Sequence, residues 1–357
     1  MKKVMVGMSG GVDSSAAALL LKEQGYEVMG VTLKMFGDED IAEAENTEKT
    51  CCALSDVFDA KSVARRLGFE HLTFNFKDCF REKVMKHFVE SYLCGRTPNP
   101  CIECNRHVKF DKMLRRAMEL GFDYIATGHY AVREYDEASG RYLLKRPVDR
   151  SKDQTYVLYS LTQEQLAHTL FPLGGLEKSQ VREIAKKAGL VNSNKPDSQD
   201  ICFIPDGKYA EFIKRFSGES SPSGDFVDIN NNILGRHNGL MNYTIGQRKG
   251  LGIALGKPAY VVRKDMDSNT VVLGDEADLY TKTLIAEDVN LISVSEITEP
   301  MRITAKTRYT QNDRPAVLSY TGGRYTVEFD EPQRAVTSGQ AVVFYDGDIV
   351  VGGGTIV

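Results

Sequence analysis

Two cysteines, Cys101 and Cys104, lie in a loop that also carries two prolines. Prolines restrict the backbone, and they therefore hold the neighbouring thiols in place. The basic residues Arg96, Arg106 and Lys109 flank the loop, and a helix is expected to begin close by. Positive charge and a helix start favour thiolate over thiol, so the loop predicts a sulfur nucleophile or a metal ligand.

Five further cysteines bring the total to seven, an odd number at irregular spacing that argues against a structural disulfide framework. Cys202 lies in a polar stretch and is the third candidate for thiol chemistry. Cys79 and Cys94 fall on a helical pattern, where a cysteine is usually an inert, small hydrophobic side chain. The adjacent pair Cys51 and Cys52 is interpreted as the start of a helix in preference to a metal site.

A glycine-rich turn, residues 9–14 with the sequence SGGVDS, separates an expected strand from an expected helix. Glycines let the backbone turn tightly and approach a ligand, and the free N–H groups at a helix start attract anionic oxygens. The alternative is an ordinary capped turn, in which Ser9 or Asp13 satisfies those N–H groups. The turn lacks the lysine of a Walker A loop, so it predicts an anion site that is not built for γ-phosphate transfer.

The elements that must position these residues follow an alternating pattern in the first half of the chain. Short β-branched runs alternate with longer helical patterns, which is typical of a parallel sheet with helices on both faces. We expect strands over residues 3–8, 27–33, 71–76 and 124–127, and helices over residues 14–24, 57–67, 78–93 and 108–120. The predicted fold class is α/β with a doubly wound parallel sheet, whose binding crevice opens near Gly128.

After about Pro205 the chain changes to short apolar stretches separated by Gly, Asn, Asp and Pro. Apart from one helical pattern over 208–216, this texture predicts small β-rich domains, the last of them a β-barrel. We therefore expect three domains, over residues 1–207, 208–278 and 279–357.

The 357 residues carry 45 Lys and Arg against 49 Asp and Glu, a formal net charge of −4. That charge gives no general attraction to nucleic acid, so such binding would need a local patch. Residues 81–116 are rich in basic side chains and follow an acidic run over 38–48, although charge runs are usually a solvated face. No apolar run is as long as a membrane helix and the start does not resemble a signal peptide, so we expect a cytoplasmic protein without a membrane partner.

The turn SGGVDS resembles the phosphate loop of the PP-loop ATP pyrophosphatases, which cleave ATP between its α and β phosphates. Six further motifs follow in the order found in the tRNA-specific 2-thiouridylases. They are GRTPNPCxxCN from residue 95, ATGHYA from residue 126, KDQTY from residue 152, DSQDICFI from residue 197, TIGQRKGLGI from residue 244 and RY at residues 308–309. The chain is similar to this family from end to end, and these motifs distinguish it from the argininosuccinate, NAD and GMP synthetases.

The resemblance implies that the protein binds ATP and Mg²⁺, with Asp13 helping to position the metal and Met35 lying against adenine. The residues implied to hold ATP are Gly7, Met8, Ser9, Gly10, Gly11, Val12, Asp13, Ser14, Met35 and Gly128.

The resemblance also implies tRNA as a partner, with a uridine of the anticodon loop extruded into the site. Asn99, Pro100 and Cys101 match the family segment that lines this base. The other implied tRNA contacts are His129, Lys152, Asp153, Gln154, Arg308, Tyr309 and Gln340. The basic, glycine-rich run 245–252 is interpreted either as a loop that orders over the tRNA backbone or as a plain connector.

The implied reaction is adenylation of the C2 oxygen of the wobble uridine by ATP, followed by replacement of that oxygen with sulfur. Cys202 accepts the sulfur as a persulfide from a cysteine desulfurase or sulfur-relay protein, and Cys104 is the partner nucleophile that forms a transient disulfide with it. Many family members carry Asp at the position of Cys101. The alternative is therefore a [4Fe–4S] cluster held by the three cysteines, with one iron open for exogenous sulfide.

Two other functions compete with tRNA thiolation. A PP-loop enzyme that amidates or ligates a small molecule would need neither Cys104 nor Cys202. An RNA-binding module without enzymatic activity would retain the turn 9–14 but would release no AMP. The intact turn and the three placed thiols favour the thiolation enzyme over both.

Overall fold

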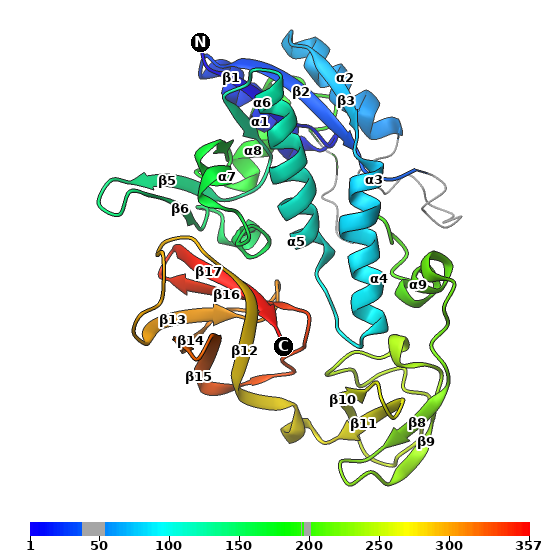
Figure 1. The fold of residues 1–357 in the computed structure, drawn as a ribbon. Helices are drawn as coiled ribbons and strands as arrows, with labels where there is room; N and C mark the ends of the chain where they lie inside the picture. Colours follow the sequence, from blue (N-terminus) through cyan, green and yellow to red (C-terminus); the bar gives the residue numbers. More distant parts are fainter. Residues whose placement is uncertain (38–53, 194, 196–200) are drawn as a thin grey trace.

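Three β-sheets, of five, four and eight strands, organise the part of the chain that the structure describes (Figure 1). The computed structural model describes residues 1–37, 54–193, 195 and 201–357. The acidic run 38–48, the pair Cys51 and Cys52, and residues 197–200 lie outside the described residues, so the expectations for them stay predictions.

The first sheet is parallel and consists of β1 (Lys3–Gly7), β2 (Glu27–Lys34), β3 (His71–Asn75), β4 (Tyr124–Ala126) and β7 (Thr169–Leu170). Its spatial order is β3-β2-β1-β4-β7, so the chain leaves β1 toward opposite sides. The predicted doubly wound α/β fold is therefore confirmed. In such a sheet a binding crevice opens at the carboxyl ends of the two strands where the order reverses, which here are β1 and β4.

Helices cover both faces of this sheet because successive residues of β1 point to opposite sides. Val4 and Val6 share one apolar cluster with residues of α1 (Val12–Glu23), α2 (Leu54–Leu67) and α8 (Lys178–Lys187). Met5 belongs to a second cluster on the other face, together with side chains of the helices described next. All three strand residues are fully buried.

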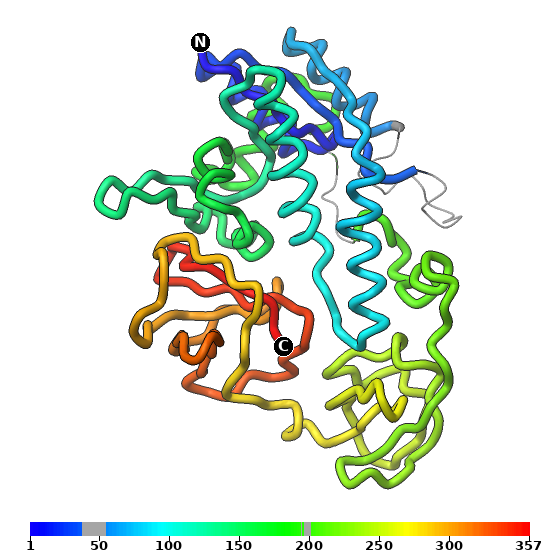
Figure 2. The backbone as a smooth tube through the Cα atoms, viewed as in Figure 1, coloured from blue at the N-terminus to red at the C-terminus, as the bar shows by residue number. Residues whose placement is uncertain are grey.

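Two long helical runs occupy the second face, and they extend away from the sheet (Figure 2). The first run joins α3 (Lys77–Phe80), a π-helical stretch η3 (Arg81–Met85) and α4 (Lys86–Leu93), which confirms the predicted helix over 78–93. The second run joins α5 (Pro100–Cys104), a π-helical stretch η4 (Asn105–Lys112) and α6 (Met113–Glu119).

The second run corrects the sequence prediction, which placed Cys101 and Cys104 in a loop before a helix starting at residue 108. The helix begins at Pro100, where a missing N–H costs nothing. Asn99 caps it, since its side-chain oxygen accepts a hydrogen bond from the backbone N–H of Cys101 at 3.1 Å. Both cysteines therefore lie on the first turns of a helix.

The four-stranded sheet has the order β10-β11-β8-β9 and consists of β8 (Gly224–Val227), β9 (Ile233–His237), β10 (Tyr260–Asp265) and β11 (Thr270–Gly274). It follows α9 (Tyr209–Ser217), which confirms the predicted helix over 208–216. Among the described residues, the remaining helices are α7 (Gln163–Ala167) and the 3₁₀ turns Arg150–Lys152, Thr155–Val157, Leu240–Asn242 and Glu276–Leu279. Within the described ranges, no helix has the length and apolar character needed to cross a membrane.

The C-terminal strands close into a barrel, as predicted. They are β12 (Tyr280–Leu291), β13 (Met301–Lys306), β14 (Arg314–Thr321), β15 (Arg324–Arg334), β16 (Ala341–Asp346) and β17 (Ile349–Ile356). The long strand β12 pairs with both β15 and β17, which joins the two ends of the sheet. A hairpin that the sequence did not predict, β5 (Val132–Asp136) and β6 (Arg141–Lys145), extends the barrel sheet because Lys145 of β6 pairs with Ile349 of β17.

Candidate active site

The turn 9–14, here called the phosphate loop, connects the end of β1 to α1. Gly10 has a positive φ of 74°, a conformation that residues with a Cβ rarely adopt. A Cβ at this position would also lie 2.5 Å from the backbone oxygen of Asp56, at the start of α2. The loop therefore reaches its tight turn only with glycine at position 10.

The first turn of α1 has no side-chain cap, so the alternative of an ordinary capped turn does not hold. The residue at the cap position is Gly11, which has no side chain, and no side-chain hydrogen bond replaces it. Ser14 instead stabilises the loop itself, because its hydroxyl donates to the carbonyl of Gly11 and accepts from the N–H of Ser9, both at 3.2 Å. Backbone N–H groups at a helix start that no side chain caps form an anion site.

Gly128, which follows β4, packs directly against the phosphate loop. A Cβ at Gly128 would lie 2.7 Å from the backbone nitrogen of Ser14 and 2.8 Å from the carbonyl carbon of Asp13. The carboxyl ends of β1 and β4 thus meet with no space between their loops, at the crevice expected from the strand order.

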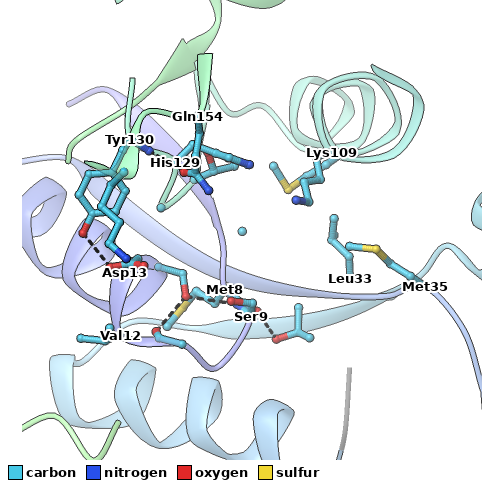
Figure 3. Close-up of a pocket in the computed structure, with 18 of the residues that line it drawn as sticks. Met8, Ser9, Val12, Asp13, Leu33, Met35, Lys109, His129, Tyr130 and Gln154 are labelled. Carbon is cyan, nitrogen blue, oxygen red and sulfur yellow. Dashed lines mark hydrogen bonds between the residues drawn. The ribbon is translucent and has the colours of Figure 1, made fainter. Parts of the chain in front are cut away.

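A cavity of about 470 Å³ opens in front of the phosphate loop (Figure 3). Every residue predicted to bind ATP lines it except Gly10, which faces α2 instead. Four of the predicted tRNA contacts also line it: His129, Lys152, Gln154 and Tyr309. The lining residues that the sequence analysis did not assign to the site are Thr32, Leu33, Lys109, Met113, Thr127 and Tyr130. The cavity therefore extends from the phosphate loop to the barrel.

Asp13 does not point freely into this cavity. Both of its carboxylate oxygens accept hydrogen bonds from Nζ of Lys178 at 2.7 Å, and the hydroxyl of Tyr130 donates to one of them at 2.9 Å. Lys178 begins α8, which packs on α1. The sequence analysis missed this pair because 165 residues separate the partners and no local pattern joins them.

Cys104 lies at the edge of the cavity. The side chain is buried, and its Sγ lies 3.7 Å from Sδ of Met35, which forms part of the cavity wall. The next residue, Asn105, fixes this helix because its amide donates to the carbonyl of Val157 at 2.8 Å. The nearby Arg106 is paired with Asp288 of the barrel, so its charge is engaged between the first 207 residues and the barrel. We call this boundary the domain seam.

Cys202 borders the same apolar core as Cys104. It is half-buried, and the following residue, Phe203, is anchored in that core with its ring edge-on to Phe80 and Phe88, each at a centroid distance of 5.6 Å. One core therefore supports the two residues that the sequence analysis assigned to sulfur transfer.

Cys101 points away from that core and is exposed. It lies near Tyr309 of the barrel: burial raises the pKa of the Tyr309 hydroxyl, and the neighbouring Asp153 and Cys101 add to this shift. Within the described residues, no group of three or more Cys, His, Asp or Glu side chains is arranged to hold a metal ion. Cys101, Cys104 and Cys202 therefore do not fit a [4Fe–4S] cluster in this arrangement.

The segment before Asn99 is held by the barrel. The N–H of Thr97 donates to the carbonyl of Ser338 at 2.9 Å, and the amide of Gln340 donates to the carbonyl of Thr97 at 2.7 Å. A Cβ at Gly339 would lie 2.8 Å from the nitrogen of Thr97. The barrel thus fixes the approach to the cysteine helix.

Three family models match consecutive parts of the chain. The model described as tRNA methyl transferase HUP domain matches residues 2–206, the tRNA methyl transferase PRC-barrel domain matches residues 210–275, and the aminomethyltransferase beta-barrel domain matches residues 281–356. A tRNA-specific 2-thiouridylase MnmA of Clostridioides difficile (strain 630) is 55% identical over 99% of this chain and 98% of its own. Another, of Acetivibrio thermocellus, is 57% identical over 99% of both chains. This chain belongs to the tRNA-specific 2-thiouridylase family.

Solved structures offer more distant similarities to this thiouridylase family member. A 4-thiouridine synthetase in complex with RNA and with bound ATP is 18% identical, with a TM-score of 0.39 over 61% of this chain and 52% of its own. At that TM-score the likeness supports no conclusion about this chain.

The thiouridylase motifs at the domain seam are partly engaged by the protein itself. The guanidinium of Arg308 donates to the carbonyl of Ala335 at 2.6 Å and to the hydroxyl of Thr337 at 3.1 Å. Burial lowers the pKa of Arg308, and the nearby Arg334 adds to the shift. The structure thus brings Arg308 and Gln340 to the seam, where each has at least one donor occupied by backbone.

The thiouridylase residues Asp153 and Gln154 are held in the same way. Asp153 accepts hydrogen bonds from the N–H and the hydroxyl of Thr155 at 2.9 and 2.6 Å, and Gln154 accepts from the N–H of Tyr130 at 2.9 Å. The neighbouring Lys152 lines the cavity with Gln154. Lys152 and Gln154 thus face the cavity, whereas Asp153 is held by Thr155 beside it.

His129 is a neutral side chain at neutral pH. Burial lowers the pKa of its imidazole well below the usual 6.5, and Lys109 adds to the shift. Its Nδ1 lies 2.8 Å from the hydroxyl of Thr127. His129 therefore presents a neutral hydrogen-bonding group to the cavity.

His71 behind the cavity predicts a pH effect on stability. The hydroxyl of Thr32 donates to the carbonyl of Met8 at 2.8 Å, so Nε2 of His71, 2.9 Å from that hydroxyl, must be the donor. Its Nδ1 is buried and has no partner. Burial, with Lys61 adding, lowers the pKa of His71 from 6.5 to about 4.

Between pH 6.5 and about 4 the unfolded chain therefore binds a proton at His71 that the folded protein does not bind. The free energy of unfolding should fall as the pH is lowered through this window, and it should be fully restored above pH 6.5. We expect His71→Gln, which keeps a donor but cannot titrate, to remove about one proton from the pH dependence measured by thermal unfolding. An unchanged slope would contradict the assignment.

Proposed function

We propose that this protein is a tRNA 2-thiolation enzyme: it uses ATP to activate the C2 oxygen of an anticodon-loop uridine and replaces that oxygen with sulfur. The observation that carries the proposal is the shape of the cavity. One cavity joins the phosphate loop, the Met35 contact of Cys104 and the barrel residue Tyr309. Nucleotide, thiol and an aromatic stacking surface thus border the same space.

In the first step the phosphate loop holds the nucleotide, with its N–H groups directed at the phosphates. Mg²⁺ would be held here chiefly by the phosphates of the nucleotide, because both carboxylate oxygens of Asp13 at the cavity wall already accept hydrogen bonds from Lys178. When bound, the metal would offset the charge that develops on the leaving pyrophosphate. Lys178 holds Asp13 in place and adds a cation close to the same charge.

The substrate base would reach the cavity along the domain seam. A uridine can stack on Tyr309, whose ring is exposed on one side and packs against Tyr156 at a centroid distance of 6.0 Å. Lys152 at the cavity wall supplies positive charge for the phosphate backbone. We propose that Arg308 and Gln340, which lie at the same seam, also contact the tRNA, and that Asn99, Pro100 and Cys101 line the extruded base.

In the second step the outer sulfur of a Cys202 persulfide attacks C2, and AMP leaves with the former oxygen. Cys104 then attacks the inner sulfur of Cys202, which frees the thiouridine and forms a Cys104–Cys202 disulfide. A thiol reductant supplies two electrons to restore both thiols. The shared core beneath Cys104 and Phe203 supports this pairing. No step is assigned to an iron–sulfur cluster.

We also propose the three-domain division 1–207, 208–278 and 279–357, because the parallel sheet, the four-stranded sheet and the closed barrel each form within one of these ranges, and among the described strands only the hairpin β5–β6 of the first range joins the barrel sheet. The first range would supply the chemistry, and the others would supply tRNA contacts.

The deciding experiment is mass spectrometry of nucleosides from tRNA incubated with the protein, Mg-ATP and a sulfur source. We expect 2-thiouridine, together with AMP and pyrophosphate whose release depends on tRNA. Nucleotide cleavage without tRNA but with a small-molecule acceptor would favour the ligase alternative. Absence of both products would favour a binding module.

Arg248 and Lys249 in the run 245–252 test the contribution of the central domain. Both are exposed, so they are available to tRNA phosphates. We expect the double change to Ala to weaken tRNA binding about tenfold and to reduce its salt dependence by one to two phosphate contacts. The control is the double change of Lys186 and Lys187 to Ala, which removes the same charge from α8. Equal salt slopes in both double variants would identify 245–252 as a plain connector.

A further inference from the structure

Lys109 is a residue of the cavity wall that belongs neither to the phosphate loop nor to the predicted tRNA contacts. It is half-buried on η4. Figure 3 shows its side chain pointing from this helix into the cavity, across from Ser9. Two lysines, Lys109 and Lys152, are the cationic side chains among the described residues that line the cavity. Lys152 is the proposed contact of the tRNA backbone, so the question is what Lys109 binds.

The helical stretch η4 packs on the carboxyl ends of β1 and β4. A Cβ at Gly7, the last residue of β1, would lie 3.4 Å from Sδ of Met113. The ring of Phe110 lies 5.7 Å from the imidazole of His129, which follows β4. Lys109 precedes Phe110 and is close enough to His129 to lower the pKa of its imidazole. Lys109 is therefore fixed above the point where the loops after β1 and β4 meet.

The π-helical form of η4 explains how a lysine five residues after Cys104 reaches this position. In an α-helix about 3.6 residues complete a turn, so residues five apart point to different sides. In η4 the hydrogen bonds reach one residue further, since the N–H of Met113 donates to the carbonyl of Val108. This wider turn brings residues five apart close to the same face. Cys104 and Lys109 therefore border the same cavity, and π-helical stretches often occur at functional sites.

The order of groups along the cavity indicates which part of ATP meets Lys109. The phosphate loop, at the start of α1, is the proposed site of the pyrophosphate that leaves. Met35, the proposed contact of adenine, lies on another side of the cavity. The α-phosphate joins adenosine to pyrophosphate and must lie between these two sites. In Figure 3 the end of the Lys109 side chain points to the space between the phosphate loop and Met35.

We infer that Lys109 is a catalytic residue of the adenylation step, in which its ammonium binds the α-phosphate of ATP. The O2 atom of the uridine forms a bond to the α-phosphorus, and the bond from this phosphorus to the bridging oxygen of pyrophosphate breaks. Pyrophosphate takes the electron pair, and the N3 proton of the uridine passes to water. Lys109 forms no covalent bond. It offsets the negative charge on the α-phosphate oxygens in this step and again when AMP leaves.

Equilibrium binding tests the phosphate contact without turnover. Full-length protein is titrated with AMP, adenosine or pyrophosphate in the presence of MgCl₂, by isothermal titration calorimetry. We expect Lys109→Met, which removes the charge and keeps a side chain of similar length, to weaken AMP binding about ten- to hundredfold. Adenosine and pyrophosphate carry no α-phosphate, so their affinities should stay within about twofold of wild type.

Lys112→Met is the matched control. Lys112 has the same charge on the same helical stretch, but it is exposed and does not line the cavity. This variant should bind AMP within about twofold of wild type. Lys109→Gln also removes the charge and covers the case that thermal unfolding shows Lys109→Met to be unfolded. The packing of Phe110 and Met113 on the sheet does not involve the Lys109 ammonium, so we expect both variants to fold.

The rate of tRNA-dependent pyrophosphate release is the second measurement. At saturating ATP and tRNA, Lys109→Met should lower kcat about 100-fold or more, because the ammonium also meets charge in the transition state. An unchanged kcat would overturn the inference, and so would AMP binding that is weakened no more than adenosine binding.

The catalytic role rests on the proposed function for the identity of the acceptor, but the phosphate contact does not. If wild-type protein released no pyrophosphate with tRNA, the proposed function would fail. The AMP titrations would still decide whether Lys109 binds the α-phosphate.

Discussion

Cys202→Ser should lower the rate of 2-thiouridine formation by about 10³-fold or more, because a hydroxyl cannot carry the transferred sulfur. Cys104→Ser should cause a similar loss of multiple turnover, because no second thiol then resolves the intermediate. Both variants should still bind ATP, since neither side chain belongs to the phosphate loop. The measurement is nucleoside mass spectrometry with an equilibrium binding assay for nucleotide.

Cys94→Ser is the control for this prediction, since Cys94 is an exposed thiol at the end of α4. It should retain thiolation activity within about twofold, as expected for a surface substitution. Retention of activity in Cys202→Ser would remove the persulfide from the mechanism.

The same series separates the two routes for sulfur. Cys101→Ser should reduce activity by at most about tenfold if Cys101 only contacts the substrate base. A complete loss of activity in Cys101→Ser, together with iron and sulfide in protein purified without oxygen, would instead favour the iron–sulfur cluster. Cys101, Cys104 and Cys202 would then have to come together from their present positions to hold it.

Gly128→Ala should raise the KM for ATP about 100-fold with little loss of folded protein. The added methyl group would lie 2.7 Å from the backbone nitrogen of Ser14, and a backbone atom cannot move aside as a flexible side chain can. The phosphate loop must therefore shift away from β4, and displaced N–H groups no longer match the phosphates. Steady-state kinetics and thermal unfolding together measure the effect.

Gly175→Ala controls for the loss of a glycine in the same domain. A Cβ at Gly175 meets no atom within 4 Å, and its backbone does not have a positive φ. It should leave the KM for ATP unchanged. A normal KM in Gly128→Ala would show that the loop tolerates displacement, which would weaken the case for a rigid phosphate site.

The sequence predicted those parts of the fold whose signals are local. The apolar run of β1 and the glycine pair after it identify the central strand and the phosphate loop. The prediction of a loop at residues 100–104, where α5 lies, was wrong. Pro98 and Pro100 favour a loop unless Asn99 is recognised as a helix cap. The hairpin of β5 and β6 was missed because it is mostly polar and is stabilised by the barrel.

The candidate site shows the same limit. Motifs around Ser9, Gly128 and Cys104 were found because their residues are adjacent in sequence, and the structure gathers them at one cavity. Lys178 could not be found in that way, since its partner lies 165 residues away. Long-range partners of this kind leave no periodicity or composition signal in a single sequence.

The pairing of β6 with β17 has a consequence for any attempt to divide the chain. The hairpin β5–β6 belongs to the first 207 residues, yet its outer neighbour is a barrel strand. Cutting the chain after residue 207 would leave the edge of β6 unpaired. The side chain of Leu144, which is fully buried in the intact protein, lies in this strand. Such an edge invites pairing with other chains, so the isolated fragment should self-associate and precipitate unless the barrel is supplied in trans.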